Sequence, residues 1–480
     1  MRVVLTVLVS LVASSLAVAR SPQNDDAIET RIQRIENNLQ PTFQVSGRPV
    51  PKSNIDDRLE ELGIPGLSIA FVNNGKIQWA KGYGSADVSE RRKVDTNTLF
   101  LAGSISKPFA ALRIHQLSER GKIDLDANVN DYLSNWKVPE NEFTKKEKVT
   151  LRRILNHTAG LTVWGFPGYD KGDDIPTVVE VLDGKGNTDP VRVFREPGKA
   201  WRYSGGGYTV MQLLTTDIEK TPYPQLMETN VLRPLGMNAS TFENPLPEKY
   251  HARAATGYRR NGSEVEGKWP IYPEMAAAGL WTTPSQLIRY AIEIQRIRRT
   301  QKDGVLSAKS VADMLKPGLN GHGLGPTTTE HTFGHGGADE GFRATLVAWN
   351  DNAHALVAMV NSDNGKILQE VVQAVAAEYG LPGYAPDVRK PVTLSKAKRE
   401  EYAGLYQIPN FGNVVVTVSG GGIAIKPQNR GAPNFYLPAG NDRFFAQSTG
   451  ARIELQTQES PVQLKIIATN LVGNRIKKAK

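Results

Sequence analysis

The sequence predicts an α+β fold: an antiparallel sheet flanked by helices with a helical subdomain, followed by a small C-terminal antiparallel β-barrel. Near the start, two alternating segments around Asn-Asn-Gly at 73–75 predict a β-hairpin. Helical patterns separate this hairpin from two more predicted strands, 344–349 and 355–361, and a closing helix, 367–379. Because strands come first, helices follow and strands return, we expect one antiparallel sheet with a helical insertion.

The first residues have the layout of a signal peptide. Arg2 supplies a positive start, residues 3–16 are mostly apolar, and Ala-Val-Ala at 17–19 supplies a small-x-small cleavage site. The apolar run is shorter and more interrupted than a membrane span requires, although an uncleaved anchor is the alternative. We therefore expect an exported protein, periplasmic or secreted, without a stable membrane anchor.

The helices and strands between these landmarks are placed by their periodicity. Ile32, Ile35 and Leu39 have helical spacing and predict a short amphipathic helix that packs on a larger body. Glycines at 63 and 121 are placed to end two further helices. Including these two, the helices predicted after the amphipathic one and before the closing helix cover 55–62, 104–120, 151–155, 208–220, 224–231 and 283–297.

After a stretch marked by prolines, short alternating segments recur at regular spacing, separated by Gly, Asn or Pro. This pattern predicts the small antiparallel barrel. The predicted strands are 414–418, 422–426, 435–438, 443–447, 451–456 and 462–468. The predicted organisation is a signal peptide at 1–19, an N-terminal segment at 20–50, the main domain at 51–382, a linker at 383–393 and a C-terminal β-domain at 394–480.

The composition excludes several classes of protein. A hydrophobic content of 40% and a charged content of 22% are those of an ordinary globular protein. The absence of cysteine rules out disulfides, thiol catalysis and thiolate metal sites. The formal charge is +9, but lysine and arginine are scattered apart from the basic tail at 475–480, so we expect no nucleic-acid partner.

The most informative motif is Leu-Ala-Gly-Ser-Ile-Ser-Lys at 101–107. Ser104 stands three residues before Lys107 at the start of a predicted helix, so hydroxyl and amine share one face. This spacing lets the amine hold the hydroxyl and help remove its proton. The same spacing at 395–398 is interpreted as a solvated turn. The alternative is that Ser104 only caps the helix, and Ser106 is a local competitor.

Further motifs follow Ser104 and Lys107 in chain order. Together with 64–68 and 81–84 before them, they resemble the serine β-lactamase and penicillin-binding-protein superfamily. The resemblance is to the branch around class C β-lactamases, which is related to D-aminopeptidases and β-lactamase-fold esterases, and it runs from about Gly63 to Tyr379. The later motifs are 155–161, 196–198, 203–208, 234–237, 279–283 and His-Gly-Gly at 335–337, where many relatives have Lys-Thr-Gly.

The resemblance implies a role for each residue of the candidate catalytic set. Ser104 would be the nucleophile that forms an acyl-enzyme, Lys107 would stay beside it, and Tyr203 would act as the base. A phenol is a poor base at neutral pH unless a nearby ammonium stabilises the phenolate, so lysine and tyrosine would work as a unit. The alternative for Tyr203 is a core tyrosine bonded through its hydroxyl.

The resemblance also implies a substrate-binding edge at 335–338. His335 would flank the pocket and contact the polar end of the substrate, although a structural histidine in a tight turn is the alternative. Gly336 and Gly337 would let the edge strand approach the substrate closely. Backbone N–H groups of Ser104 and Ala338 would form an oxyanion hole. No cofactor is needed for this chemistry, and we expect no metal site.

One departure from the family pattern concerns the substrate. Relatives that cut β-lactams or peptides usually carry Asn at the third place of the tyrosine motif, where its amide contacts an amide of the substrate. This chain has Gly205, so that contact is missing unless Asn156 or another residue substitutes. The change puts efficient β-lactam turnover in doubt and favours esters.

The sequence therefore predicts an exported serine hydrolase that cleaves an amide or ester: a β-lactam, a D-amino-acid peptide or a small ester. The alternatives are a penicillin-recognising protein that traps the acyl group without turnover, and an inactive scaffold whose barrel binds a partner. The C-terminal β-domain resembles domains appended to D-aminopeptidase-like hydrolases, and it would either shape the site or act as a spacer. The oligomeric state is left open.

Overall fold

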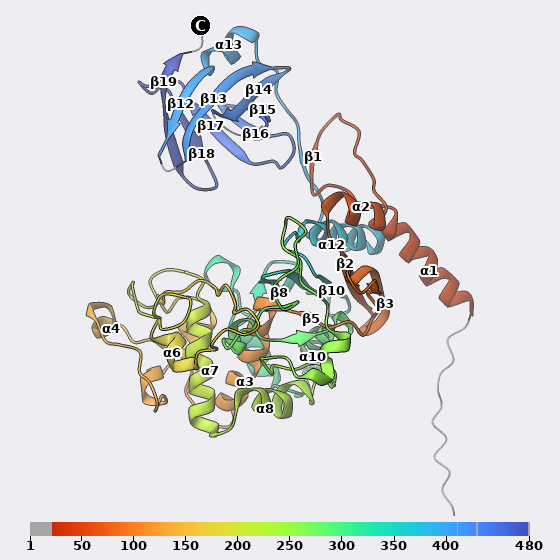
Figure 1. Ribbon diagram of the computed structural model, residues 1–480, viewed down its shortest axis with the longest axis vertical. Coiled ribbons are helices and arrows are strands. Elements are labelled where there is room, and N and C mark those ends of the chain that lie inside the picture. The colour runs from red at the N-terminus through yellow and green to blue at the C-terminus, as the bar shows by residue number, and fades with distance from the viewer. Residues whose placement is uncertain (1–21, 410, 429–430, 479–480) are drawn as a thin grey trace, which may run out of the picture.

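A seven-stranded sheet forms the centre of the main body (Figure 1). The computed structural model describes residues 22–409, 411–428 and 431–478, so the predicted signal peptide at 1–19 lies outside the described residues. All strand pairs in this sheet are antiparallel, which confirms the predicted α+β class. In spatial order the strands are β4 (Arg92–Lys93), β3 (Lys76–Asp87), β2 (Gly66–Asn73), β10 (Ala355–Val360), β9 (Phe342–Trp349), β8 (Thr332–Asp339) and β7 (Thr327–Thr328).

The predicted hairpin joins β2 to β3. Its turn residues Asn74 and Gly75 both have positive φ, 52° and 71°, as a two-residue hairpin of type I′ requires. Strand β2 is buried along nearly its whole length because helices cover both faces of the sheet. Its residues alternate between two cores: Ala70 and Val72 face one core, and Leu67, Ile69 and Phe71 face the other.

On one face of the sheet, α12 (Lys366–Tyr379) packs with α1 (Pro22–Glu36) and α2 (Ile55–Leu62). The Arg34 guanidinium of α1 donates to both carboxylate oxygens of Glu378 in α12, at 2.5 and 3.1 Å. Ile32 and Ile35 are buried, as the predicted amphipathic helix requires, whereas Leu39 lies beyond the helix and pairs with Ser53.

The other face carries α10 (Pro284–Thr300) and the helical insertion, in which α4, α6 and α7 lie at a distance from α1 and α2 (Figure 1). The predicted helix at 104–120 is instead a 3₁₀ turn, Gly103–Ile105, followed by α3 from Ser106 to Glu119. The other helices of this region are α4 (Glu142–Lys146), α5 (Leu151–Leu155), α6 (Val178–Leu182), α7 (Gly205–Glu219), α8 (Tyr223–Met227), α9 (Met275–Ala278) and α11 (Ala308–Met314).

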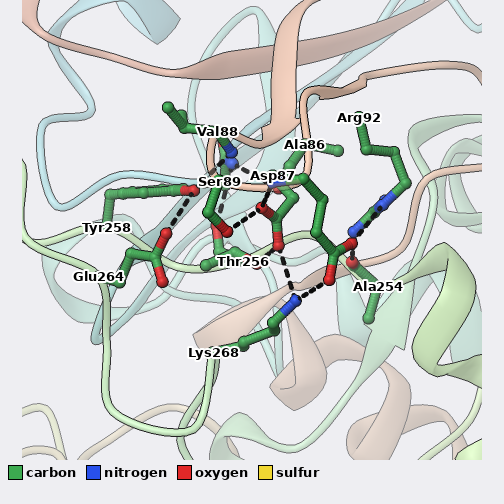
Figure 2. A network of polar contacts seen from close by, with 12 residues as sticks. Ala86, Asp87, Val88, Ser89, Arg92, Ala254, Thr256, Tyr258, Glu264 and Lys268 are labelled. Carbon is green, nitrogen blue, oxygen red and sulfur yellow. Dashed lines mark hydrogen bonds and ion pairs between the residues drawn. The ribbon is translucent and has the colours of Figure 1, made fainter.

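A buried carboxylate ties the end of β3 to the loops at 254–268 (Figure 2). Asp87 is fully buried and accepts hydrogen bonds from Ser89 Oγ, the Glu90 amide, Thr256 Oγ1 and, at 2.9 Å, Lys268 Nζ. Both oxygens of this carboxylate are therefore paired, so the hydrogen bonds offset the cost of its burial and hold this corner of the sheet together.

The C-terminal segment is a closed antiparallel barrel, as predicted. The sequence did not predict its first and last strands, and the basic tail at 475–480 is largely the last of them: β19 pairs with β12 and β18 and closes the barrel. Ser395 caps the short helix α13 (Lys396–Glu401). The strands are β12 (Gly404–Ile408), β13 (Gly412–Ser419), β14 (Gly422–Pro427), β15 (Asn434–Gly440), β16 (Arg443–Ala446), β17 (Arg452–Gln456), β18 (Gln463–Ile466) and β19 (Leu471–Lys478).

Two segments far apart in the chain meet beside the barrel. Strand β1 (Phe43–Val45) pairs in parallel with β11 (Asp387–Arg389), and the Phe43 ring packs edge-on against Phe445 with centroids 5.7 Å apart. Arg389 donates to the carbonyl of Gly450 at 2.6 Å. The N-terminal segment and the predicted linker are therefore paired with each other, and both contact the barrel. Over the residues that the structure describes, no helix is long and apolar enough to cross a membrane.

Candidate active site

The candidate nucleophile lies on the 3₁₀ turn that precedes α3. Ser104 is partly exposed, and its Oγ accepts a hydrogen bond from Lys107 Nζ at 2.9 Å. Lys107 is only 2% exposed and also donates to the carbonyl of Ala277 in α9 at 2.7 Å. The predicted contact between hydroxyl and amine is thus present. The competitor Ser106 is fully buried, with its Oγ bonded to the Gly103 carbonyl and the Leu280 amide.

Tyr203 lies across the cavity from the turn, immediately before Ser204, the N-cap of α7. Lys107 Nζ lies 5.0 Å from the centre of the Tyr203 ring and 5.5 Å from the centre of the Tyr208 ring. Tyr208 is fully buried and donates its hydroxyl proton to the Leu155 carbonyl, which is the core role that was the alternative for Tyr203. Tyr203 itself is partly exposed and lines the cavity.

Strand β8 forms the opposite wall and presses closely against the turn that carries Ser104. A Cβ added at Gly337 would lie 2.0 Å from the Ala102 carbonyl oxygen, and one at Gly103 would lie 2.6 Å from the Ala338 nitrogen. Only glycine fits at either position. This close approach places the Ala338 amide beside the turn, where the oxyanion hole is expected.

The cavity between these walls has a volume of about 690 Å³. All of the predicted site residues line this cavity except Gly205. Among the lining residues that the sequence did not predict are two aromatic residues, a histidine and an acid. The cavity is lined by Ser104, Lys107, Trp164, Gly165, Phe166, Tyr203, Ala277, Ala278, His322, Thr327, His335, Gly336, Gly337, Ala338, Asp339, Arg343, Ala344, Thr345, Gly365, Leu368 and Gln369.

Three buried histidines surround Tyr203. Burial lowers the pKa of His322 to about 4 and that of His335 to about 3, and it holds the pKa of His157 well below its ordinary value. His157 Nδ1 accepts from the Ser204 amide at 3.2 Å, and His335 Nδ1 donates to the Gly336 carbonyl at 2.6 Å. All three rings are therefore neutral near pH 7.

Two carboxyl groups near the cavity are buried: Asp339, which belongs to the cavity lining, and Glu274, which precedes α9. Burial raises the pKa of Glu274 and that of Asp339 to about 8 each, and the Gly103 amide and the Lys107 charge only partly oppose the rise at Asp339. Neither side chain has a local sequence pattern that would have marked it. Over residues 22–409, 411–428 and 431–478, no group of His, Asp and Glu has the arrangement of a metal site.

The position of the missing Asn is filled by an aromatic ring. A Cβ added at Gly205 would lie 2.9 Å from Cε2 of Phe166 and 3.2 Å from the Trp164 carbonyl oxygen. Asn156 does not substitute, because its Oδ1 accepts from the amide and hydroxyl of Thr158 within its own loop. The cavity therefore presents hydrocarbon where the resemblance leads us to expect an amide.

The chain belongs to the Beta-lactamase family, whose model matches residues 52–378. PbpX of Bacillus subtilis (strain 168) is 26% identical over 320 residues, which cover 66% of this chain and 75% of PbpX. The structure is similar to that of the octameric penicillin-binding protein homologue from Pyrococcus abyssi, with a TM-score of 0.61 at 20% identity over 87% of this chain and 98% of that one. It is also similar to the D-amino acid amidase from Ochrobactrum anthropi SV3, with a TM-score of 0.58 at 20% identity over 74% and 99% of the two chains.

Proposed function

We propose that this protein is a serine hydrolase that cleaves an ester or amide through an acyl-enzyme on Ser104. The observation that carries the proposal is the 2.9 Å contact between Lys107 Nζ and Ser104 Oγ at the floor of the cavity. A hydroxyl is a weak nucleophile until a neighbouring group takes its proton or stabilises its anion. A buried lysine that donates to the hydroxyl oxygen stabilises that anion as it develops.

The proposed reaction has two steps. Ser104 Oγ attacks the carbonyl carbon, its proton passes to Tyr203, and Tyr203 returns the proton to the oxygen or nitrogen that leaves as the C–O or C–N bond breaks. A water molecule then attacks the acyl carbon and gives its proton to Tyr203. The Oγ–C bond breaks, Ser104 recovers the proton, and the acid is released.

The oxyanion that forms in both steps is assigned to the amides of Ser104 and Ala338. The lack of a side chain at Gly103 and Gly337 supports this assignment, because it lets β8 and the turn meet at van der Waals distance. Amides held on a rigid strand and turn are already oriented when the charge develops, so they stabilise the transition state without reorganisation. His335 is assigned to the wall of the pocket, which its bond to the Gly336 carbonyl and its place in the cavity lining support.

The proposed substrates are small esters, D-amino-acid amides or peptides, and β-lactams. Membership of the Beta-lactamase family and the similarity to the D-amino acid amidase from Ochrobactrum anthropi SV3 support an amide or peptide. The ring of Phe166 at the Gly205 position favours esters over substrates that need an amide contact. We also propose that the protein is exported, to the periplasm or outside the cell. The main domain is proposed to end near residue 382 and the C-terminal β-domain to begin near residue 394.

The test is the intact mass of the protein after brief exposure to a penicillin, a cephalosporin and a short-chain ester, with product release followed in parallel. Wild type is compared with Ser104→Ala and Tyr203→Phe. We expect a serine-dependent adduct or turnover, with Tyr203→Phe binding substrate but turning it over slowly. An adduct that forms and is never released would identify an acyl trap, and equal activity in Ser104→Ala would refute the proposed nucleophile.

A further inference from the structure

The loop at 161–168 is bound along its backbone to the first turn of α7. The carbonyl of Trp164 accepts from the Gly205 amide and that of Val163 from the Gly206 amide, both at 3.1 Å. Amides in the first turn of a helix have no partner within the helix, so this loop supplies their acceptors. These two bonds fix the loop backbone at Val163 and Trp164 to the first turn of the helix.

The lack of side chains at Gly205 and Gly206, the first residues of α7, allows this close approach. A Cβ added at Gly206 would lie 3.0 Å from the Thr162 carbonyl oxygen, and one at Gly205 would lie 2.9 Å from Cε2 of Phe166. Val163 adopts a φ of 61°, a left-handed conformation that β-branched residues avoid. Such strain persists only where surrounding contacts fix the backbone, and it is typical of functional sites.

This loop supplies two aromatic side chains to the cavity. Phe166 fills the volume beside Gly205, and Trp164 lies with its ring centre 5.7 Å from that of Tyr203. Trp164 is 64% exposed, which leaves most of a large apolar ring in solvent at the cavity mouth. We call Trp164, Phe166 and Tyr203 the aromatic shelf; all three line the same cavity as Ser104.

We propose that the aromatic shelf binds the acyl group of the substrate and selects flat apolar acyl groups, aromatic ones above all. This inference rests on the proposed hydrolase function and adds its substrate class. The resemblance places an amide-contacting Asn at the Gly205 position, so the part of the substrate that would meet that amide here meets the Phe166 ring. A flat apolar group gains from contact with Trp164 and Phe166, whereas an amide there loses its hydrogen bonds to water without replacement.

The test uses three p-nitrophenyl esters with the same leaving group: acetate, phenylacetate and N-acetylglycinate. The measured quantity is kcat/KM for phenylacetate divided by that for N-acetylglycinate. Trp164→Ala is expected to lower this ratio about tenfold through a higher KM for phenylacetate, the size of effect that an apolar contact in a pocket has on selectivity. Because Trp164 is largely exposed, this variant is not expected to disturb folding.

Two further variants test the Phe166 position. Phe166→Ala should lower the ratio as Trp164→Ala does, and combining it with Gly205→Asn should turn the preference toward N-acetylglycinate, because the amide then has both room and a partner. The control is Phe194→Ala, another partly exposed phenylalanine, which lies outside the cavity lining and should leave the ratio unchanged.

The outcomes separate the two proposals. If wild type hydrolyses none of the three esters, including acetate, the inference is refuted, and the proposed function fails as well only if the penicillin and the cephalosporin also give no Ser104-dependent adduct or turnover. If acetate is hydrolysed in a Ser104-dependent way but the ratio is the same in wild type, Trp164→Ala and Phe166→Ala, the hydrolase stands and the aromatic shelf is refuted.

Discussion

Glu274 offers a test of how the site's buried acids affect stability. It precedes α9, the short helix whose Ala277 carbonyl accepts from Lys107. Its side chain is fully buried, and within the described residues neither carboxyl oxygen has a hydrogen-bond partner. Burial raises the pKa of Glu274 to about 8, so the group is protonated in the folded protein at pH 7. The perturbation is Glu274→Gln, which keeps the shape and cannot ionise.

The expected magnitude follows from proton linkage. Between the unfolded pKa near ~4.3 and the folded pKa of about 8, the folded state holds one proton that the unfolded state has released. Wild-type stability from this group therefore falls as pH rises through that window, by about 1.4 kcal/mol per pH unit, or about 4 kcal/mol by pH 7. Glu274→Gln lacks this loss, so its stability relative to wild type should rise with pH and level off above pH 8.

The assay is thermal unfolding of both proteins at pH 5, 6, 7 and 8. The control is Glu266→Gln, an exposed glutamate, whose melting temperature relative to wild type should not change with pH over this range. A difference between Glu274→Gln and wild type that stays constant from pH 5 to 8 would mean that Glu274 is ionised in the fold, and the reasoning would be wrong.

Three further predictions concern the site and the sheet. Gly337→Ala should lower kcat/KM by on the order of 100-fold, because the added methyl displaces the turn that carries Ser104, whereas Gly336→Ala, with nothing nearer than 4.0 Å, should lower it far less. Because the pKa values of His322 and His335 lie near 4 and 3, kcat/KM should be flat through pH 6.5; a bend there would contradict their neutrality. Asp87→Asn should destabilise the protein by about 2 kcal/mol at pH 7 through lost bonds to a charged group. Burial favours a higher pKa at Asp87, but its hydrogen bonds outweigh burial and hold that pKa well below its ordinary value. This stabilisation is present above pH ~4 and is lost as pH falls, so the difference should shrink in denaturation at pH 3.

The sequence predicted the parts of the site that depend on local spacing or on the family resemblance. Ser104 and Lys107 are three residues apart, so local spacing predicts their contact, and it forms although Ser104 lies on a 3₁₀ turn and not on α3. Phe166 and Glu274 gave no such signal, because Phe166 acts through its contact with Gly205, distant in the chain, and Glu274 through its burial. Neither property is visible as a periodicity.

The fold shows the same division. Alternation predicted the hairpin and six of the barrel strands, and the structure confirms the α+β class and the barrel. The sequence predicts only a basic tail at 475–480 where much of strand β19 lies, because Arg475, Lys477 and Lys478 conceal the alternation. A barrel strand has one face in solvent, so charged residues there are compatible with pairing, and only the partner strands β12 and β18 reveal it.

The pairing of β1 with β11 has a consequence for the order in which the chain acquires its structure. Arg34 and Glu378, which join α1 to α12, are separated by 344 positions, and Phe43 meets Asp387 at a similar separation. At a synthesis rate of roughly 5–20 residues per second, the early segment waits on the order of 20–70 s before its partners exist. During that interval α1 has contacts with β3, through Glu36 and Tyr83, but the surface of α1 that packs on α12 and the edge of β1 are uncovered. The surface of α1 that packs on α12 and the edge of β1 are thus among the last surfaces to be covered, and a chaperone that holds the nascent chain would have its greatest effect there.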